Sequence, residues 1–515
     1  MLLAPRKGLV ALGALTAVGG FACSKDYDAF LQGGATTTTT TGAGGTGTGG
    51  TTSGGGGTGG ILEGGGGAGG SLPPALWAES ITGVMPGGAA AFSVAADADG
   101  NVLVTGQGAS PIDLDGKPVA ACAGTSAFVA KIAPSGLPLW RKCFPATKGS
   151  AGQEITVDSE GNAYVAGTFN GSITLGADTY LAGSVDAFVV KLDPAGNPAW
   201  SKWLEGSGST WISGIATAGD AVVVTGALTQ SFKIESTTLE AAGAAQLYVA
   251  RLAAGNGALV WAEGFGDAGN DAGPLPTVTG KALTGRVAVS PALDVYVVAS
   301  FSQDFYLPDA VTLIGHSGGS QFDTYLLHLD PAGAVLHHRF WGNNGKEEQG
   351  RAVAVDPASG HVFVTGIFED PISFDGNTLT PDGQDAYLVE LASDLTYQWA
   401  TSIGGADVQD AFAVAVDGTS VLVAGKFKNT LTLGAGPTYP VGAGEDGYVA
   451  RFEAGTTNAA ATLIGPGGNE RAFGVAFSTD AVATAGSFEK TVTIGGKDLT
   501  SPAAAAGFVA RIATP

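Results

Sequence analysis

One short segment recurs seven times along the chain, about every 60 residues, and this repetition limits the possible folds more than any other feature. Each copy starts with an aromatic residue followed by a small or aliphatic pair, and the copies begin at Phe128, Phe188, Tyr248, Tyr325, Tyr387, Tyr448 and Phe508. A second marker keeps the same phase, with glycines at Gly106, Gly167, Gly226, Gly366, Gly425 and Gly486 and with Ser300 expected in the remaining position. Two markers in phase indicate a repeat protein.

Each repeat is predicted to hold four short strands, because the segments are rich in Val, Ala, Phe, Tyr and Ile. Repeat 2 shows them at residues 154–158, 162–167, 187–192 and 198–204. Asp, Asn, Pro and Gly join the first pair and again the second pair, as in tight turns. No segment after residue 72 keeps a helical period. The chain is therefore expected to be all-β.

Four-stranded units form a β-propeller when they repeat around an axis, and a solenoid when they stack in a line. The last repeat stops after its third strand, whereas residues 75–81 look like a fourth strand that lacks its first three. An N-terminal strand that completes the last blade would remove the exposed edges. We therefore predict a seven-bladed β-propeller of four-stranded blades over residues 72–515, closed by the N-terminal strand.

The repeat also resembles a known family. Its best copies are residues 353–356 (VAVD) with 361–366 (HVFVTG), and residues 186–193 (DAFVVKLD) with Trp200. They are similar to a bacterial β-propeller repeat family of secreted lipoproteins and cell-surface proteins. The resemblance implies a seven-bladed fold and an envelope or extracellular setting. It implies no catalytic motif, and a fold does not by itself supply a function.

The N-terminal region is predicted to be an export signal and a tether. Arg6 and Lys7 precede an apolar stretch at residues 8–22, which is typical of a secretory signal peptide. Residues 20–24 (GFACS) resemble a bacterial lipobox, which predicts lipid attachment at Cys23; a plainly cleaved signal is the alternative. Residues 33–71 are almost entirely Gly and Thr, so residues 23–71 are expected to be the anchor region and a disordered linker.

Charge and cysteine content limit the partners and the compartment. With 24 Lys and Arg against 46 Asp and Glu, the net charge is -22, which argues against nucleic acid and against anionic lipid headgroups. Membrane contact is therefore expected through the lipid anchor alone. The two other cysteines lie in one repeat. Cys122 precedes the expected third strand, and Cys143 lies on the expected fourth strand, which should pair with the third. In an exported protein we expect them to form a disulfide.

Several motifs suggest chemistry, and each has a simpler structural interpretation. The tryptophans of the fourth strands recur with the repeat, so packing between blades is favoured over a sugar-binding surface; they are Trp77, Trp140, Trp200, Trp261 and Trp399. Residues 315–319 (GHSGG) match a serine hydrolase motif but fall where other repeats have a loop. The five histidines lack zinc-ligand spacing, and His328 is expected at a solvated strand position.

Carboxylates recur at two equivalent positions. Asp97, Asp158, Asp356 and Asp417 mark one turn, where we expect turn capping, with weak calcium binding as the open alternative. Asp186, Asp323, Asp385 and Asp446 precede the aromatic of the third strand, where we expect capping of a strand edge, with a negatively charged ring on one face as the alternative. No cofactor is predicted.

The longest interval between repeats, 77 residues, reflects an insertion at residues 266–285, which is either a plain surface loop or a functional one.

The function predicted from these features is that of a monomeric, non-enzymatic interaction or scaffold module at the bacterial outer membrane or cell surface, which binds a protein or a glycan at a propeller face. A carbohydrate-active or other propeller enzyme, and a purely structural envelope protein, are the alternatives. Catalytic residues would have to break the sevenfold pattern and converge on one cleft, so non-repeated acids or histidines in one deep pocket would contradict the non-enzymatic interpretation.

Overall fold

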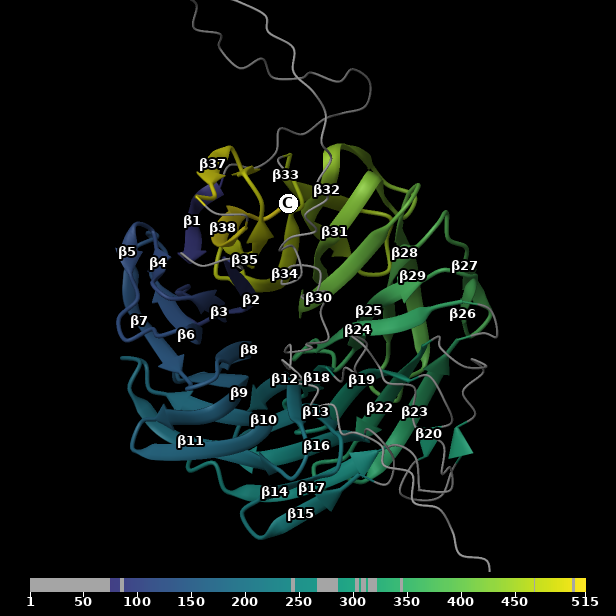
Figure 1. Ribbon diagram of the computed structural model, residues 1–515. Helices are drawn as coiled ribbons and strands as arrows, with labels where there is room; N and C mark the ends of the chain where they lie inside the picture. Colours follow the sequence, from purple (N-terminus) through teal and green to yellow (C-terminus); the bar gives the residue numbers. More distant parts are fainter. Residues whose placement is uncertain are drawn as a thin grey trace, which may run out of the picture.

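The computed structural model describes residues 75–83, 88–241, 246–265, 286–301, 305–306, 312–313, 322–342, 346–466, 468–502 and 505–515 (Figure 1). The predicted signal peptide, Cys23 and the Gly/Thr linker lie outside these residues, as do the GHSGG motif and the insertion at 266–285. Within the described ranges the chain is all-β, and no helix there is long and apolar enough to cross a membrane.

Six repeats each contribute four antiparallel strands that pair in chain order, first to fourth, and the last repeat contributes three that pair in the same way with the N-terminal strand as the fourth. The repeats are numbered here from the one with Phe128 to the one with Phe508. Their first strands are β2 (Ala89–Ala96), β8 (Ser150–Val157), β12 (Thr210–Ala218), β18 (Arg286–Val289), β24 (Glu348–Val355), β30 (Gln409–Asp417) and β34 (Arg471–Ser478). Their second strands are β3 (Val102–Ala109), β9 (Ala163–Leu175), β13 (Ala221–Leu228), β19 (Val295–Phe301), β25 (Val362–Phe368), β31 (Ser420–Leu433) and β35 (Ala481–Phe488).

The third strands are β6 (Thr125–Ile132), β10 (Asp178–Leu192), β16 (Gln246–Ala253), β22 (Asp323–Leu329), β28 (Asp385–Leu391), β32 (Thr438–Glu453) and β38 (Ala506–Ala513). The fourth strands are β7 (Pro138–Pro145), β11 (Pro198–Gly206), β17 (Leu259–Phe265), β23 (Val335–Trp341), β29 (Tyr397–Gly404), β33 (Ala459–Gly465) and, for the last repeat, β1 (Ala75–Gly83). As the sequence predicts, β1 pairs with β38, and Trp77 lies opposite Arg511.

The first strands lie next to one another around a common centre (Figure 1). Along the chain, β8 contacts β2 and β12, β18 contacts β12 and β24, and β30 contacts β24 and β34. The last of these strands, β34, also contacts β2. The described residues therefore form an all-β, propeller-like fold of antiparallel sheets.

The prediction of four strands per repeat was incomplete, because the chain forms a further hairpin between the second and third strands. In five repeats the hairpin has its own strands, which are β4 (Ile112–Leu114) and β5 (Lys117–Pro118), β14 (Ser231–Ile234) and β15 (Thr237–Glu240), β20 (Phe305–Tyr306) and β21 (Thr312–Leu313), β26 (Ile372–Phe374) and β27 (Asn377–Leu379), and β36 (Thr491–Ile494) and β37 (Lys497–Thr500). In the other two, β9 with β10 and β31 with β32 run on into it.

Several hairpins attach one repeat to the one before it. β4 pairs with β1, β14 with β11, β31 with β29, and β36 with β33, so each of these hairpins covers the edge of the preceding fourth strand. The turn at Asp115 and Gly116 has positive φ at both residues, as a two-residue type I′ hairpin requires. The hairpins protect sheet edges that would otherwise be open to pairing with another chain.

The repeated glycine of the second strand makes room for the aromatic residue of the third. A Cβ on Gly106 would lie 2.9 Å from the ring of Phe128 and still closer to the Ala90 carbonyl. The expectation that Ser300 fills this position in repeat 4 was wrong by one residue. Ala299 is the residue paired with Tyr325, whereas Ser300 is paired with Thr324. The turn from Ser290 to Asp294 has the same length as the turn from Asp97 to Asn101, so the register counted from that turn places Ala299 in this position.

Candidate functional site

One cavity of about 150 Å³ lies where the first strands of all the repeats meet. A β-bulge recurs in most of these strands and turns their middle residues toward the centre, as between Gly152 and Glu154 in β8. The same register position lines the cavity in every repeat: it is the first-strand residue paired with the second-strand residue just before the repeated glycine slot. Its residues, called the cavity ring here, are Ser93, Glu154, Gly214, Arg286, Ala352, Ala413 and Gly474.

Two members of the cavity ring break the repeat, and they carry opposite charges. Glu154 of repeat 2 and Arg286 of repeat 4 form an ion pair, and Arg286 Nη1 also donates to the Ser213 carbonyl of repeat 3. Gly214 is the ring residue of the repeat between them, and it has no side chain to separate the pair. The Glu154 and Arg286 side chains are 16% and 12% exposed. Polar groups therefore line one side of the cavity, and small residues line the other.

The next position along each first strand is aliphatic and β-branched in every repeat. These residues, called the aliphatic collar here, are Val94, Ile155, Ile215, Val287, Val353, Val414 and Val475. The position before the cavity ring is aromatic in three repeats. There Phe412 and Phe92 pack against Phe473, with ring centroids 5.4 and 6.5 Å away. The cavity thus places a single pair of opposite charges beside apolar walls.

The tryptophans of the fourth strands pack between repeats, as predicted. At four of the five predicted positions the indole Nε1 donates to a carbonyl in the turn between the third and fourth strands of the next repeat, and the fifth, Trp399, packs against Phe452 of the next repeat with ring centroids 6.5 Å apart. The pairs are Trp77 with Pro134 at 3.0 Å, Trp140 with Pro194 at 3.0 Å, Trp200 with Ala254 at 3.1 Å, and Trp261 with Pro331 at 2.9 Å. These side chains therefore connect neighbouring repeats.

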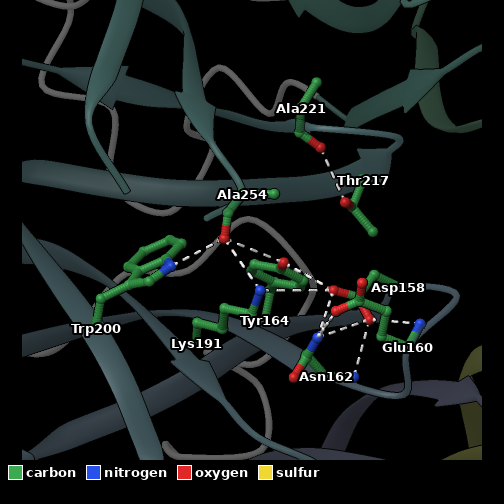
Figure 2. Close-up of polar contacts among 9 residues, drawn as sticks. All are labelled: Asp158, Glu160, Asn162, Tyr164, Lys191, Trp200, Thr217, Ala221 and Ala254. Carbon is green, nitrogen blue, oxygen red and sulfur yellow. Dashed lines mark hydrogen bonds and ion pairs between the residues drawn. The ribbon is translucent and has the colours of Figure 1, made fainter. Parts of the chain in front are cut away.

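Figure 2 shows this junction between repeats 2 and 3. Trp200 and Lys191 both donate to the Ala254 carbonyl, each at 3.1 Å, and Lys191 lies over the ring of Tyr164. The Lys191 ammonium is also 3.7 Å from the Asp158 carboxylate. Burial opposes ionisation of Asp158, but hydrogen bonds from Asn162 and Tyr164 outweigh it, so the pKa of this carboxyl is lowered. The junction holds its acid and base together as charged partners.

The expectation that His328 lies at a solvated strand position was wrong. Its position is not solvated, because His328 is only 5% exposed, and the equivalent Lys131 is also buried, 2.8 Å from the Asp97 carboxylate. His328 Nε2 lies 3.7 Å from Asp294, and burial lowers the pKa of the imidazole while that carboxylate opposes the shift. The error arose because the acidic partner comes from the turn between the first two strands, far away in the sequence.

Both sets of repeated aspartates include residues that cap backbone groups; these are Asp97, Asp158 and Asp356 at the first turn, and Asp186 and Asp385 before the third strand. At the first turn, Asp97 accepts from the Asn101 amide nitrogen at 2.9 Å and from its side chain at 2.8 Å. Before the third strand, Asp186 accepts from Gly206 N at 3.2 Å and from Trp203 Nε1 at 2.8 Å. Asp186 is fully buried, and Asp323, Asp385 and Asp446 are buried as well, so they do not form a charged ring on the surface.

Burial raises the pKa of two of these carboxyls, Asp186 and Asp385, to about 6, although backbone and side-chain donors oppose the shift. In the part of the chain that the structure describes, no group of three or more His, Cys, Asp or Glu side chains is arranged to hold a metal ion.

Cys122 and Cys143 form a disulfide in the structure, with their Cα atoms 5.2 Å apart. It joins the segment before β6 to β7, as the sequence predicts.

The residues that the sequence did not single out are Glu154 and Arg286. Each departs from its repeat, and an alignment of the seven first strands at the glycine slot would have revealed both. Their contact was not predictable from spacing, because repeats 2 and 4 meet only across the centre of the fold. Glu154 is a non-repeated acid in the cavity, but its partner there is a guanidinium and not a second carboxylate.

Comparisons with known proteins give fold-level likeness only. No protein-family model matches the chain, and no curated protein matches it. A protein of unknown function from Bacteroides caccae is 14% identical, with a TM-score of 0.32, over 64% of this chain and 92% of its own. A quinohemoprotein alcohol dehydrogenase from Comamonas testosteroni is 11% identical, with a TM-score of 0.35; the match covers 85% of this chain and 76% of the dehydrogenase chain. A europium-containing methanol dehydrogenase is 10% identical, with a TM-score of 0.36; the match covers 82% of this chain and 92% of the dehydrogenase chain. Similarities this distant carry no argument about the function of this chain.

Proposed function

We propose that this chain is an exported, lipid-anchored, seven-bladed β-propeller that acts as a rigid, non-enzymatic interaction module at the cell surface. Each four-stranded group is one blade, and β1 closes the ring. The pairing of β1 with β38 and the contact of β34 with β2 support this arrangement. The resemblance of residues 20–24 to a lipobox supports attachment at Cys23, and the Gly/Thr-rich segment would then hold the ring away from the membrane.

The observation that carries the interaction role is a set of exposed apolar side chains at one register position. The residue before the repeated tryptophan position is a β-bulge on the outermost strand, so its side chain turns to solvent. Leu76, Leu139, Val260 and Leu336 occupy this position and are 49%, 55%, 52% and 49% exposed. A partner that covers them removes apolar surface from water, which favours binding. A protein partner fits this surface better than a glycan.

The non-enzymatic part of the proposal rests on how the cavity charges are used. Acid–base hydrolysis of glycosides usually needs two carboxyl groups that face each other across the scissile bond. In the cavity, the one ring carboxylate faces an arginine instead.

The interaction role is tested by affinity capture from surface extracts of the native host with the full chain and the triple variant L139S/V260S/L336S. Loss of the captured protein with the triple variant supports the proposal. The control is L181S, since Leu181 is 70% exposed but lies in the hairpin part of β10 and not at the bulge position. Equal capture by the wild type and the triple variant contradicts a role of these exposed bulge residues in binding.

The anchor is tested separately by growth of the host with a radioactive fatty acid. Label is expected in the wild-type chain and not in C23S, and a wild-type chain without label contradicts lipid attachment.

A further inference from the structure

We propose that the central cavity is a binding site for a small zwitterion with an aliphatic body, of which a branched-chain α-amino acid is the simplest example. The cavity joins the Glu154–Arg286 ion pair to the aliphatic collar. This inference does not depend on lipid attachment or on the exposed residues before the repeated tryptophans, and it assigns a ligand to a place where two of the seven repeats depart from the others in charge.

The departure from the repeat is the first argument. Five of the seven cavity-ring residues are Ser, Ala or Gly, and the remaining two are a complementary acid and base on repeats 2 and 4. A semi-buried ion pair contributes little net stability, because both charges lose hydration on burial. Stability alone is therefore a weak reason for a fold to hold this pair at its centre.

The unfilled space beside the pair is the second argument. A cavity of about 150 Å³ accepts a ligand of roughly the size of benzene, which sets the upper range of the ligand's body. The side chains of both charged residues remain partly exposed, at 16% for Glu154 and 12% for Arg286. A ligand in the cavity therefore has access to one carboxylate and one guanidinium at the same time.

The chemical class of the ligand follows from the requirement that Glu154 and Arg286 both keep a partner of opposite charge. An anion that binds Arg286 leaves the Glu154 carboxylate without its guanidinium, and a cation that binds Glu154 leaves Arg286 unpaired; both outcomes are unfavourable beside apolar walls. A zwitterion supplies an ammonium for Glu154 and a carboxylate for Arg286, so every charge keeps a partner. Its apolar remainder then packs against collar residues such as Ile155 and Val287.

The test is isothermal titration calorimetry on the full chain with L-valine, and with two analogues that each lack one charge. Isovalerate is valine without the ammonium, and isobutylamine is valine without the carboxylate. Saturable binding of L-valine, at least about tenfold tighter than that of either analogue, is expected, because each analogue forfeits one charge-assisted contact. Absence of saturable heat for L-valine up to roughly 10 mM, or equal affinities for all three compounds, overturns the proposal.

Two variants separate binding from folding. E154Q and R286Q are each expected to weaken L-valine binding at least about tenfold while their circular dichroism spectra stay native. The matched control is E235Q, which removes a carboxylate 2.7 Å from Lys202 on the outer strands and is expected to bind L-valine like the wild type. L-valine affinity that is unchanged in E154Q and R286Q contradicts the site. If a variant unfolds, the comparison of L-valine with its two analogues on the wild-type chain decides alone.

Discussion

Replacement of Trp77 tests whether the N-terminal strand is joined to the first repeat as firmly as the internal repeats are joined to one another. The Trp77 side chain comes from β1, is 5% exposed, and donates to the Pro134 carbonyl of repeat 1 at 3.0 Å. Truncation of a buried tryptophan to alanine costs about 3–5 kcal/mol. W77A is therefore expected to lower the free energy of unfolding by that amount, as measured by urea denaturation at an unchanged m-value.

W77F separates packing from hydrogen bonding at the same site. Phenylalanine keeps most of the buried apolar area but cannot donate to Pro134. Since Pro134 is exposed, water can replace the lost donor, and the expected cost is about 1 kcal/mol. The control is L76S, at a residue 49% exposed beside Trp77, with an expected change within about 0.5 kcal/mol.

A coupled substitution tests the contact directly. Gly136 has a φ of +88° and its Cβ would lie 3.1 Å from the Trp77 ring, so G136A is expected to destabilise the wild-type chain and to cost less in the W77A background. Additive effects of G136A and W77A, or a W77A cost within about 0.5 kcal/mol of zero, would refute the reasoning.

Three further predictions concern other repeated contacts. In repeat 2 the third strand carries the base, Lys191, whereas in repeat 5 it carries an acid, Glu390, whose carboxylate lies 2.7 Å from His361 Nδ1. E390K is expected to lower the free energy of unfolding by about 1–3 kcal/mol in urea denaturation, and H361D/E390K is expected to recover at least half of that loss. No recovery in the double variant would contradict the pairing. The pKa of Asp186 is raised to about 6 in the fold, above its usual 3.8, so its contribution to stability is present below pH 4 and is lost as the pH rises through 6. The free energy of unfolding of the wild type, measured relative to that of D186N, should thus fall by about 2–3 kcal/mol between pH 4 and 7.5, and a constant difference would be inconsistent with the shift. Removal of the Cys122–Cys143 disulfide, whose cysteines are 21 residues apart, in C122S/C143S is expected to cost about 3 kcal/mol in the same assay, and an unchanged urea midpoint would show that the bond does not stabilise the fold.

The sequence predicted the features that depend on local pattern and on repetition. The order of the four strands, the pairing of β1 with β38 and the packing of Trp140 and Trp200 between repeats all follow from markers that recur in phase. The hairpins were missed although Asp115-Gly116 and Asp375-Gly376, flanked by alternating apolar residues, are a strong hairpin signal.

Contacts between residues far apart in the sequence were harder to predict. His328 was expected to face solvent, but its partner Asp294 lies in the turn between β18 and β19 of the same repeat, and strand alternation does not show that this turn reaches the side chain. Glu154 and Arg286 meet only because the first strands of repeats 2, 3 and 4 curve around one centre, with Gly214 between them. This curvature arises from the packing of several repeats against one another, so the sequence of a single repeat does not predict it.

The proposal that β1 closes a ring of seven blades is tested most directly by hydrogen exchange of the backbone amides of β1. If β1 is a true fourth strand, its amides that face β38 should be protected to an extent comparable with those of β11, the fourth strand of repeat 2. Exchange of β1 at the rate of an unstructured peptide, with β11 still protected, would contradict the closed ring.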